Sequence, residues 1–132
     1  MNFNFIPFTL NADLSHFQAQ IQYISSENGV DLYKARQGLK KPILGILVSE
    51  VNLYFFEGSL ITVYIHLKEK QFNISQIKYI LEKVFNTKAM ILSNDSGIVY
   101  YWKDESFYLG LLPMKDRNYL VLYYTLNNYC VF

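Results

Sequence analysis

Few side chains in this 132-residue sequence have the type and the spacing that catalysis or metal binding requires. The two histidines, His16 and His66, fall on different predicted elements, and neither has a second histidine, a cysteine or a carboxylate at metal-ligand spacing. The single cysteine, Cys130, has no neighbouring base that could activate a thiol nucleophile. The six glycines form neither of the common phosphate-binding patterns. We therefore expect no metal, no cofactor and no catalytic residue, and a protein that is not an enzyme.

Carboxylates that could act in acid–base chemistry stand at predicted turns. Asp104 and Glu105 separate two predicted strands, and Glu57 precedes Gly58 at another predicted turn, positions that local backbone requirements explain. A hydrolase without a recognisable motif would need His66 beside Asp104 or Glu105 across neighbouring strands. This arrangement is the enzymatic alternative.

The clearest element signal is a helix from about Ile74 to Phe85. Asn73 is a favourable N-cap residue, and Gln76 follows at the spacing of a capping box. Apolar residues recur along one side of this segment at helical spacing. Asn86 can adopt the left-handed conformation that ends a helix. The pattern predicts one amphipathic helix in the second half of the chain.

The rest of the second half has the pattern of strands. β-Branched and aromatic residues are concentrated in segments that short turns separate. Loops this short favour a four-strand antiparallel meander. The predicted strands are Lys88–Ser93, Gly97–Lys103, Ser106–Leu112 and Asn118–Leu126.

The first half resembles a looser copy of the same plan. Asn11 or Asp13 could cap a helix whose apolar residues are Leu14, Phe17, Ile21 and Ile24, and Asn28-Gly29 then turns the chain. Alternatively, Gln20–Ser25 is a strand that pairs with Val30–Leu32, so whether the helix extends past Ala19 stays open. The strands predicted after it are Val30–Arg36, Ile43–Phe56 with a bend near Ser49–Asn52, and Ser59–Lys68, the last two joined by Glu57-Gly58.

Together these elements predict an α+β fold. We expect an antiparallel β-sheet of two meanders with two helices packed on one face. Residues 1–132 form a single domain with pseudo-repeat halves at about 10–70 and 71–126, because a chain of this length builds one core.

Composition and charge narrow the classes of partner. Twelve basic and eleven acidic residues leave a net charge of +1, and the ten lysines and two arginines are spread along the chain. We expect no nucleic-acid and no membrane partner, because both need a basic field. Met1–Leu10 carries no basic residue, and Ile43–Val48 is too short to span a bilayer, so we expect a soluble, cytoplasmic protein.

Aromatic residues make up 17% of the chain, with 12 Tyr, 10 Phe and 1 Trp. Strand alternation assigns some of them to the core, namely Phe17, Phe85, Tyr100, Trp102 and Tyr124. It assigns others to one outer face, namely Tyr64, His66, Tyr101, Lys103, Tyr108, Tyr119 and Tyr123. Tyrosine suits a partner-binding surface, but cross-strand aromatic pairs also stabilise any sheet, and both interpretations stay open.

The order of elements resembles the helix-plus-meander domains of the β-lactamase-inhibitor-protein-like type and of the outer-membrane-assembly lipoprotein (SmpA/OmlA) type. The segments that carry the resemblance are Leu53–Leu60, Ile77–Phe85 and Tyr100–Lys103. The chain lacks the lipobox cysteine, the signal peptide and the paired cysteines found there. In kind, it is also similar to small immunity proteins of bacterial toxin systems. These resemblances imply a domain that acts by binding another protein.

The sequence therefore favours a non-enzymatic protein-binding module, most concretely a bacterial inhibitor or immunity protein that occludes a cognate toxin. The tyrosine face would supply the contacts, together with the loops at Asp104-Glu105 and Lys115–Arg117. Replacing Tyr64, Tyr101 or Tyr123 with alanine should then weaken binding and leave thermal stability nearly intact. A small carrier or sensor of apolar ligands is the alternative. A homodimer is a further one, formed through the face or through an exposed edge strand such as Asn118–Leu126.

Overall fold

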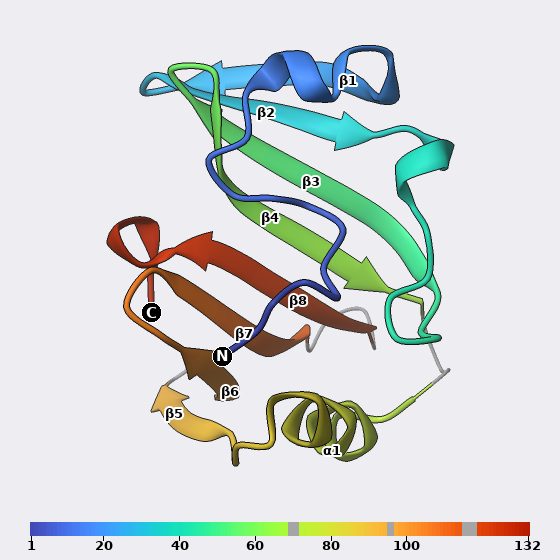
Figure 1. Ribbon diagram of the computed structural model, residues 1–132, viewed down its shortest axis with the longest axis vertical. Helices are drawn as coiled ribbons and strands as arrows, with labels where there is room; N and C mark the ends of the chain where they lie inside the picture. Colours follow the sequence, from blue (N-terminus) through green and yellow to red (C-terminus); the bar gives the residue numbers. More distant parts are fainter. Residues whose placement is uncertain (69–71, 95–96, 115–118) are drawn as a thin grey trace.

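An eight-stranded antiparallel sheet dominates the structure (Figure 1). The computed structural model describes residues 1–68, 72–94, 97–114 and 119–132. The strands are β1 (Ile21–Glu27), β2 (Val30–Ala35), β3 (Val48–Phe56), β4 (Ser59–Leu67), β5 (Met90–Asn94), β6 (Gly97–Lys103), β7 (Phe107–Met114) and β8 (Tyr119–Leu126). Their spatial order is β1-β2-β3-β4-β8-β7-β6-β5.

The sheet consists of two four-strand meanders that join where β4 pairs with β8. The antiparallel sheet of meanders agrees with the sequence prediction. The segment Asn118–Leu126, however, is no edge strand: Asn118 lies outside the described residues, and β8 stands at the centre of the sheet. The two edge strands are β1 and β5.

Two tight turns set the register of the first meander. Asn28 and Gly29 have φ angles of 53° and 81°, and Glu57 and Gly58 have 50° and 80°. Positive φ at both central residues is the requirement of a type I′ hairpin turn. Farther along, the β3–β4 pairing shifts between Val48 and Glu50, at the predicted bend.

The helix α1 (Ile74–Phe85) has the predicted bounds and caps. The Asn73 side chain accepts a hydrogen bond from the Gln76 backbone N–H, and the Gln76 side chain accepts one from the Asn73 N–H, each at 2.9 Å. Asn86 is left-handed at the C-terminal end. The capping box and the terminal asparagine were therefore sufficient to locate this helix.

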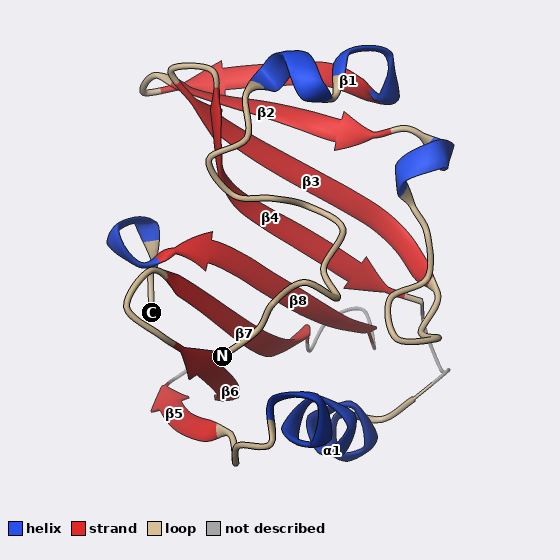
Figure 2. Ribbon diagram, viewed as in Figure 1, coloured by secondary structure: helices blue, strands red, loops and turns tan. Residues whose placement is uncertain are grey.

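The predicted second helix is wrong, and with it the two-helix α+β fold (Figure 2). The described residues contain one α-helix, α1. Residues 14–20 form two short 3₁₀ helices, η1 (Leu14–His16) and η2 (Gln18–Gln20). Strand β1 then begins at Ile21 and pairs with β2, as the alternative interpretation of Gln20–Ser25 required.

Backbone hydrogen bonding explains why no helix forms there. The Asn11 N–H donates to the Leu60 carbonyl at 2.8 Å, and the Leu14 N–H donates to the Gly58 carbonyl at 2.8 Å. Backbone groups of residues 11–14 are therefore already hydrogen-bonded to the start of β4 and to the turn before it. Asp13 caps only the short turn, accepting from the Ser15 N–H, and Gln18 has a φ of 25°, which an α-helix cannot continue.

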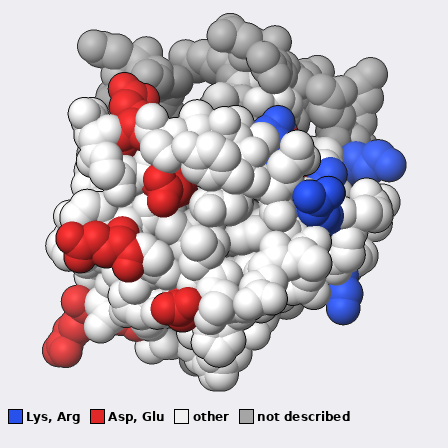
Figure 3. Space-filling view, turned by 90° about the horizontal axis from the view of Figure 1, so that it is seen from above, with Lys and Arg blue, Asp and Glu red and all other residues white. Residues whose placement is uncertain are grey.

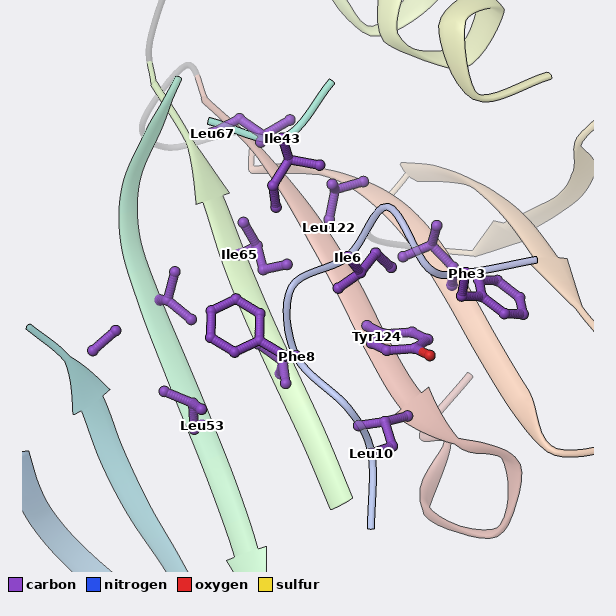
Figure 4. Close-up of a cluster of buried hydrophobic side chains, with 14 of the residues drawn as sticks. Phe3, Ile6, Phe8, Leu10, Ile43, Leu53, Ile65, Leu67, Leu122 and Tyr124 are labelled. Atoms are coloured by element: carbon purple, nitrogen blue, oxygen red, sulfur yellow. The ribbon is translucent and has the colours of Figure 1, made fainter. Parts of the chain in front are cut away.

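The N-terminal segment takes the place of the missing helix (Figure 4). It crosses the same face of the sheet that α1 covers, and its apolar side chains join those of α1 in one core. Phe3, Ile6, Phe8 and Leu10 are buried against residues of the central strands, including Ile65 and Leu122. The five aromatic residues assigned to the core by alternation all pack in this cluster.

No helix in the described ranges is long and apolar enough to cross a membrane.

Candidate binding surface on the second face of the sheet

The residues predicted to share an outer face do lie together on one side of the sheet, opposite α1 and the N-terminal segment. We call this side the second face. Cross-strand register and ring contacts connect its members: Tyr64 packs on Tyr123 with ring centroids 4.9 Å apart, and Tyr101 stacks on Tyr108 at 5.2 Å. His66 and Tyr119 are in ring contact at 5.3 Å. The face is therefore an aromatic layer that extends over β4, β8, β7 and β6.

The middle of this layer is covered by the C-terminal tail, residues 127–132. Asn127–Tyr129 forms the 3₁₀ helix η4, after which the Tyr123 hydroxyl donates to the Tyr129 carbonyl at 3.3 Å and accepts from the Val131 N–H at 3.2 Å. The Phe132 ring packs on Tyr123 at 5.4 Å. Beneath the tail, Tyr123 is 1% exposed and Tyr108 is 4% exposed.

Burial corrects the expectation for these two tyrosines. Tyr108 and Tyr123 belong to a second apolar cluster with Val99, Leu112 and Val121, and cannot contact a partner while the tail is in place. Burial also raises the pKa of both phenols, because a charged phenolate is poorly solvated there. Replacing Tyr123 with alanine should therefore destabilise the fold, contrary to the expectation of unchanged stability.

Asp104 serves the β6–β7 turn. Its carboxylate accepts hydrogen bonds from the Ser106 and Phe107 N–H groups, each at 2.9 Å. The Asn127 side chain donates to its backbone carbonyl at 2.7 Å. Lys103 beside it is exposed. The second predicted contact loop, Lys115–Arg117, lies outside the described residues.

The open part of the second face is a shallow groove where β3, β4 and β8 meet. It has a volume of about 540 Å³, and we call it the basic groove. Its lining residues are Lys40, Ser49, Glu50, His66, Leu67, Lys68 and Tyr119. His66 and Tyr119, predicted from strand alternation, thus meet here with residues that the alternation argument did not select.

Hydrogen bonds hold the floor of the basic groove in place. The Ser49 hydroxyl donates to the His66 carbonyl at 3.1 Å, and the Asn52 Nδ2 lies 3.4 Å from the His66 Nε2. Lys34 pairs with Glu50 at 2.6 Å, and this hydrogen bond holds the pKa of the Glu50 carboxyl below its ordinary value, against the opposing effect of burial. Glu50 is therefore ionised and matched by Lys34.

The surroundings of the basic groove remain cationic. Among the described residues, three lysines, Lys34, Lys40 and Lys68, stand around one carboxylate, Glu50. Lys68 is exposed and Lys40 is half-buried, so both can reach a bound group. The groove therefore suits an anionic ligand with an aromatic or apolar portion against His66 and Tyr119.

Charges are segregated between the two ends of the strands, and Figure 3 shows acidic side chains on one side of the molecule and basic ones on the other. The end that holds the β1–β2, β3–β4 and β6–β7 turns carries Glu27, Asp31, Glu57, Asp104 and Glu105. The opposite end carries Lys34, Arg36, Lys40, Lys41 and Lys68. Sequence reasoning missed this separation, because it saw only charges spread along the chain.

The structure does not bring together the pair that a hydrolase would need. His66 lies opposite Val121 on β8, whereas Phe107, just after the β6–β7 turn, lies opposite Leu126. Five residues along a strand amount to roughly 17 Å, so His66 is far from Asp104 and Glu105. Within the described ranges, no three His, Cys, Asp or Glu side chains are grouped so that they could hold a metal ion.

Comparisons with family models, with curated proteins and with solved structures each return no match. The resemblance to helix-plus-meander inhibitor domains therefore stays a prediction.

Proposed function

We propose that the protein is a non-enzymatic binding module that takes up an acidic segment of another protein in the basic groove. A bacterial inhibitor or immunity protein that occludes a cognate toxin is the class that the sequence favours. The proposed contact region is therefore the basic groove rather than the whole second face. Its proposed contact residues are His66, Tyr119, Lys40 and Lys68.

The meeting of an aromatic pair with exposed lysines supports this proposal. Tyr119 and His66 offer large, rigid surfaces that lose little side-chain entropy on binding. Lys40 and Lys68 supply long-range attraction for carboxylates, which speeds association and selects partners by charge. Because the Lys34–Glu50 ion pair and the hydrogen bond of Ser49 already order the floor of the groove, binding requires little rearrangement.

The cavity beside α1 is too small to hold the apolar ligand of the alternative function. The cavity between the sheet and α1 that Ile46, Leu67, Phe72 and Ile77 line has a volume of about 20 Å³. A cavity of this size holds about one water molecule. A carrier would need a far larger enclosed volume, of the order of 300 Å³ or more.

Co-purification from the native host tests the proposal, with Lys68→Glu as the groove variant and Lys88→Glu as its control. Both lysines are exposed, but Lys88 lies after α1, away from the groove. We expect native mass spectrometry to show a second polypeptide on the wild type and on Lys88→Glu, with at least tenfold less on Lys68→Glu. Tyr119→Ala should show the same loss.

Two results would contradict the proposal. One is a polypeptide that binds the wild type and Lys68→Glu equally, which places the contact elsewhere. The other is a co-purifying small apolar molecule without any polypeptide, which favours the carrier.

A further inference from the structure

We propose that two copies of this chain form a two-fold symmetric dimer in which β5 of one copy pairs antiparallel with β5 of the other. The two sheets would then continue into one. This inference goes beyond the proposed function and does not depend on it, because the basic groove lies on β3, β4 and β8, away from β5.

The outer edge of β5 offers backbone groups that no described strand pairs with, and it lacks charge, proline and a bulge. Among the described residues, β6 is the one strand that pairs with β5. The strand Met90–Asn94 contains no charged residue and no proline, and its pairing with β6 runs without a register shift. Natural sheet edges normally carry such features, and an edge without them is a template for pairing with another chain.

The opposite edge, β1, has the protection that β5 lacks. Its pairing with β2 shifts register between Tyr23 and Ser25, which is a bulge. It ends at Glu27, and Ser26 in it donates to the Asp31 carboxylate. The edge strand β1 therefore has features that prevent pairing with another chain, and the edge strand β5 lacks these features.

Exposed apolar side chains accompany the open edge. Ile91 is 62% exposed, Met90 is 49% exposed and Ile98 on the adjacent strand is 45% exposed. Ile91 lies opposite Tyr100, on the face where α1 packs, but α1 buries its apolar residues against the core and leaves this hairpin uncovered. A strand added along β5 would cover part of this apolar surface, which lies on both faces of the hairpin.

A second copy fits this edge because the strand is complementary to itself. Antiparallel pairing centred on Leu92 sets Ile91 opposite Ser93 and Met90 opposite Asn94, so no like charges oppose one another. The nearby Lys78 and Glu82 form an ion pair, at 3.5 Å. Pairing of β5 with β5 of a second copy also uses up the interface in a dimer. Pairing of β5 with β1 of the next copy would instead leave a free edge at each end and build a filament.

Sedimentation equilibrium tests the dimer directly, with Ile91→Lys and Ile98→Lys as edge variants and Ile24→Lys on β1 as the matched control. Ile24 is 42% exposed on the other edge strand. We expect the wild type and Ile24→Lys to approach twice the 15.6 kDa mass of one chain. The dissociation constant of both edge variants should rise at least tenfold, with thermal unfolding showing that each variant remains folded.

Three outcomes would overturn the dimer. The first is a wild type that stays monomeric up to about 100 μM, a concentration at which even a weak specific pair associates. The second is loss of association in Ile24→Lys but not in Ile91→Lys, which places the contact on β1. The third is growth into assemblies larger than two copies, which indicates an open contact.

Discussion

The two buried tyrosines of the second face differ in what their hydroxyl groups do. The Tyr123 hydroxyl bonds to the tail twice, through the Tyr129 carbonyl and the Val131 N–H. The Tyr108 hydroxyl is buried without a hydrogen-bond partner among the described residues. A buried polar group that lacks a partner costs roughly 1–3 kcal/mol of desolvation. The hydroxyl of Tyr123 therefore stabilises the fold, whereas the hydroxyl of Tyr108 destabilises it.

Removing the two hydroxyls separates these effects. Tyr108→Phe should leave the free energy of unfolding unchanged or raise it by about 1 kcal/mol, because the ring stays and the unpaired group is lost. Tyr123→Phe should lower it by about 1 kcal/mol, because two bonds to the tail are lost. Urea denaturation of both variants measures the difference, and equal losses in the two would contradict it.

Strand alternation could place side chains on a face but could not say whether that face is open. Tyr64, Tyr108 and Tyr123 share a face because residues two apart in a strand point the same way, which is a local property. Their burial depends on residues 127–132, whose path over the sheet has no periodic signal. The basic groove was missed for a similar reason, since Lys40, in the loop before β3, and Lys68, directly after β4, come together only in the folded protein.

At the scale of elements, the helix prediction was correct for α1, where capping residues stand at both ends of the helix. The reciprocal bonds of Asn73 and Gln76 satisfy backbone N–H groups that would otherwise lack partners at the start of α1. Leu14, Phe17 and Ile21 also have helical spacing, yet their segment forms 3₁₀ turns and a strand. There the pairing of residues 11–14 with β4 and the turn at Asn28-Gly29 outweigh the apolar pattern.

The capping box gives a test at the same scale. Asn73→Ala should lower the free energy of unfolding by about 1 kcal/mol, because the cap bond to the Gln76 N–H is lost. Ser75→Ala in the same turn is the control, since Ser75 is exposed and its change should have an effect of less than about 0.5 kcal/mol. Chemical denaturation compares the two, and a larger loss for Ser75→Ala would show that the cap is not the source of helix stability.

At the scale of the whole molecule, buried tyrosines make stability depend on alkaline pH. Burial raises the pKa of Tyr64, Tyr108 and Tyr123 above the ordinary value of 10, and raises that of Tyr124 to about 12. The folded state therefore favours the neutral phenols. Their contribution is fully present below pH 10, the unfolded value, and is lost as the pH rises through the folded values.

The free energy of unfolding should therefore be flat between about pH 7 and about pH 9 and fall steeply above about pH 10. Urea denaturation at several pH values measures the slope. Tyr124→Phe should make the slope shallower, because one proton fewer is linked to unfolding. An unchanged stability up to about pH 12 would contradict this linkage.

The join between the two meanders has a consequence for the order of folding. The β1–β2 and β3–β4 hairpins of the first meander close over tight turns at Asn28-Gly29 and Glu57-Gly58. Thr62 and Thr125, by contrast, whose hydroxyls lie 2.7 Å apart in the buried centre of the sheet, stand 63 positions apart in the chain. Closing so long a loop costs chain entropy that the local hairpins avoid. We therefore expect each meander to assemble by itself, and the docking of β4 onto β8 to be the slow step that commits the chain to its native state.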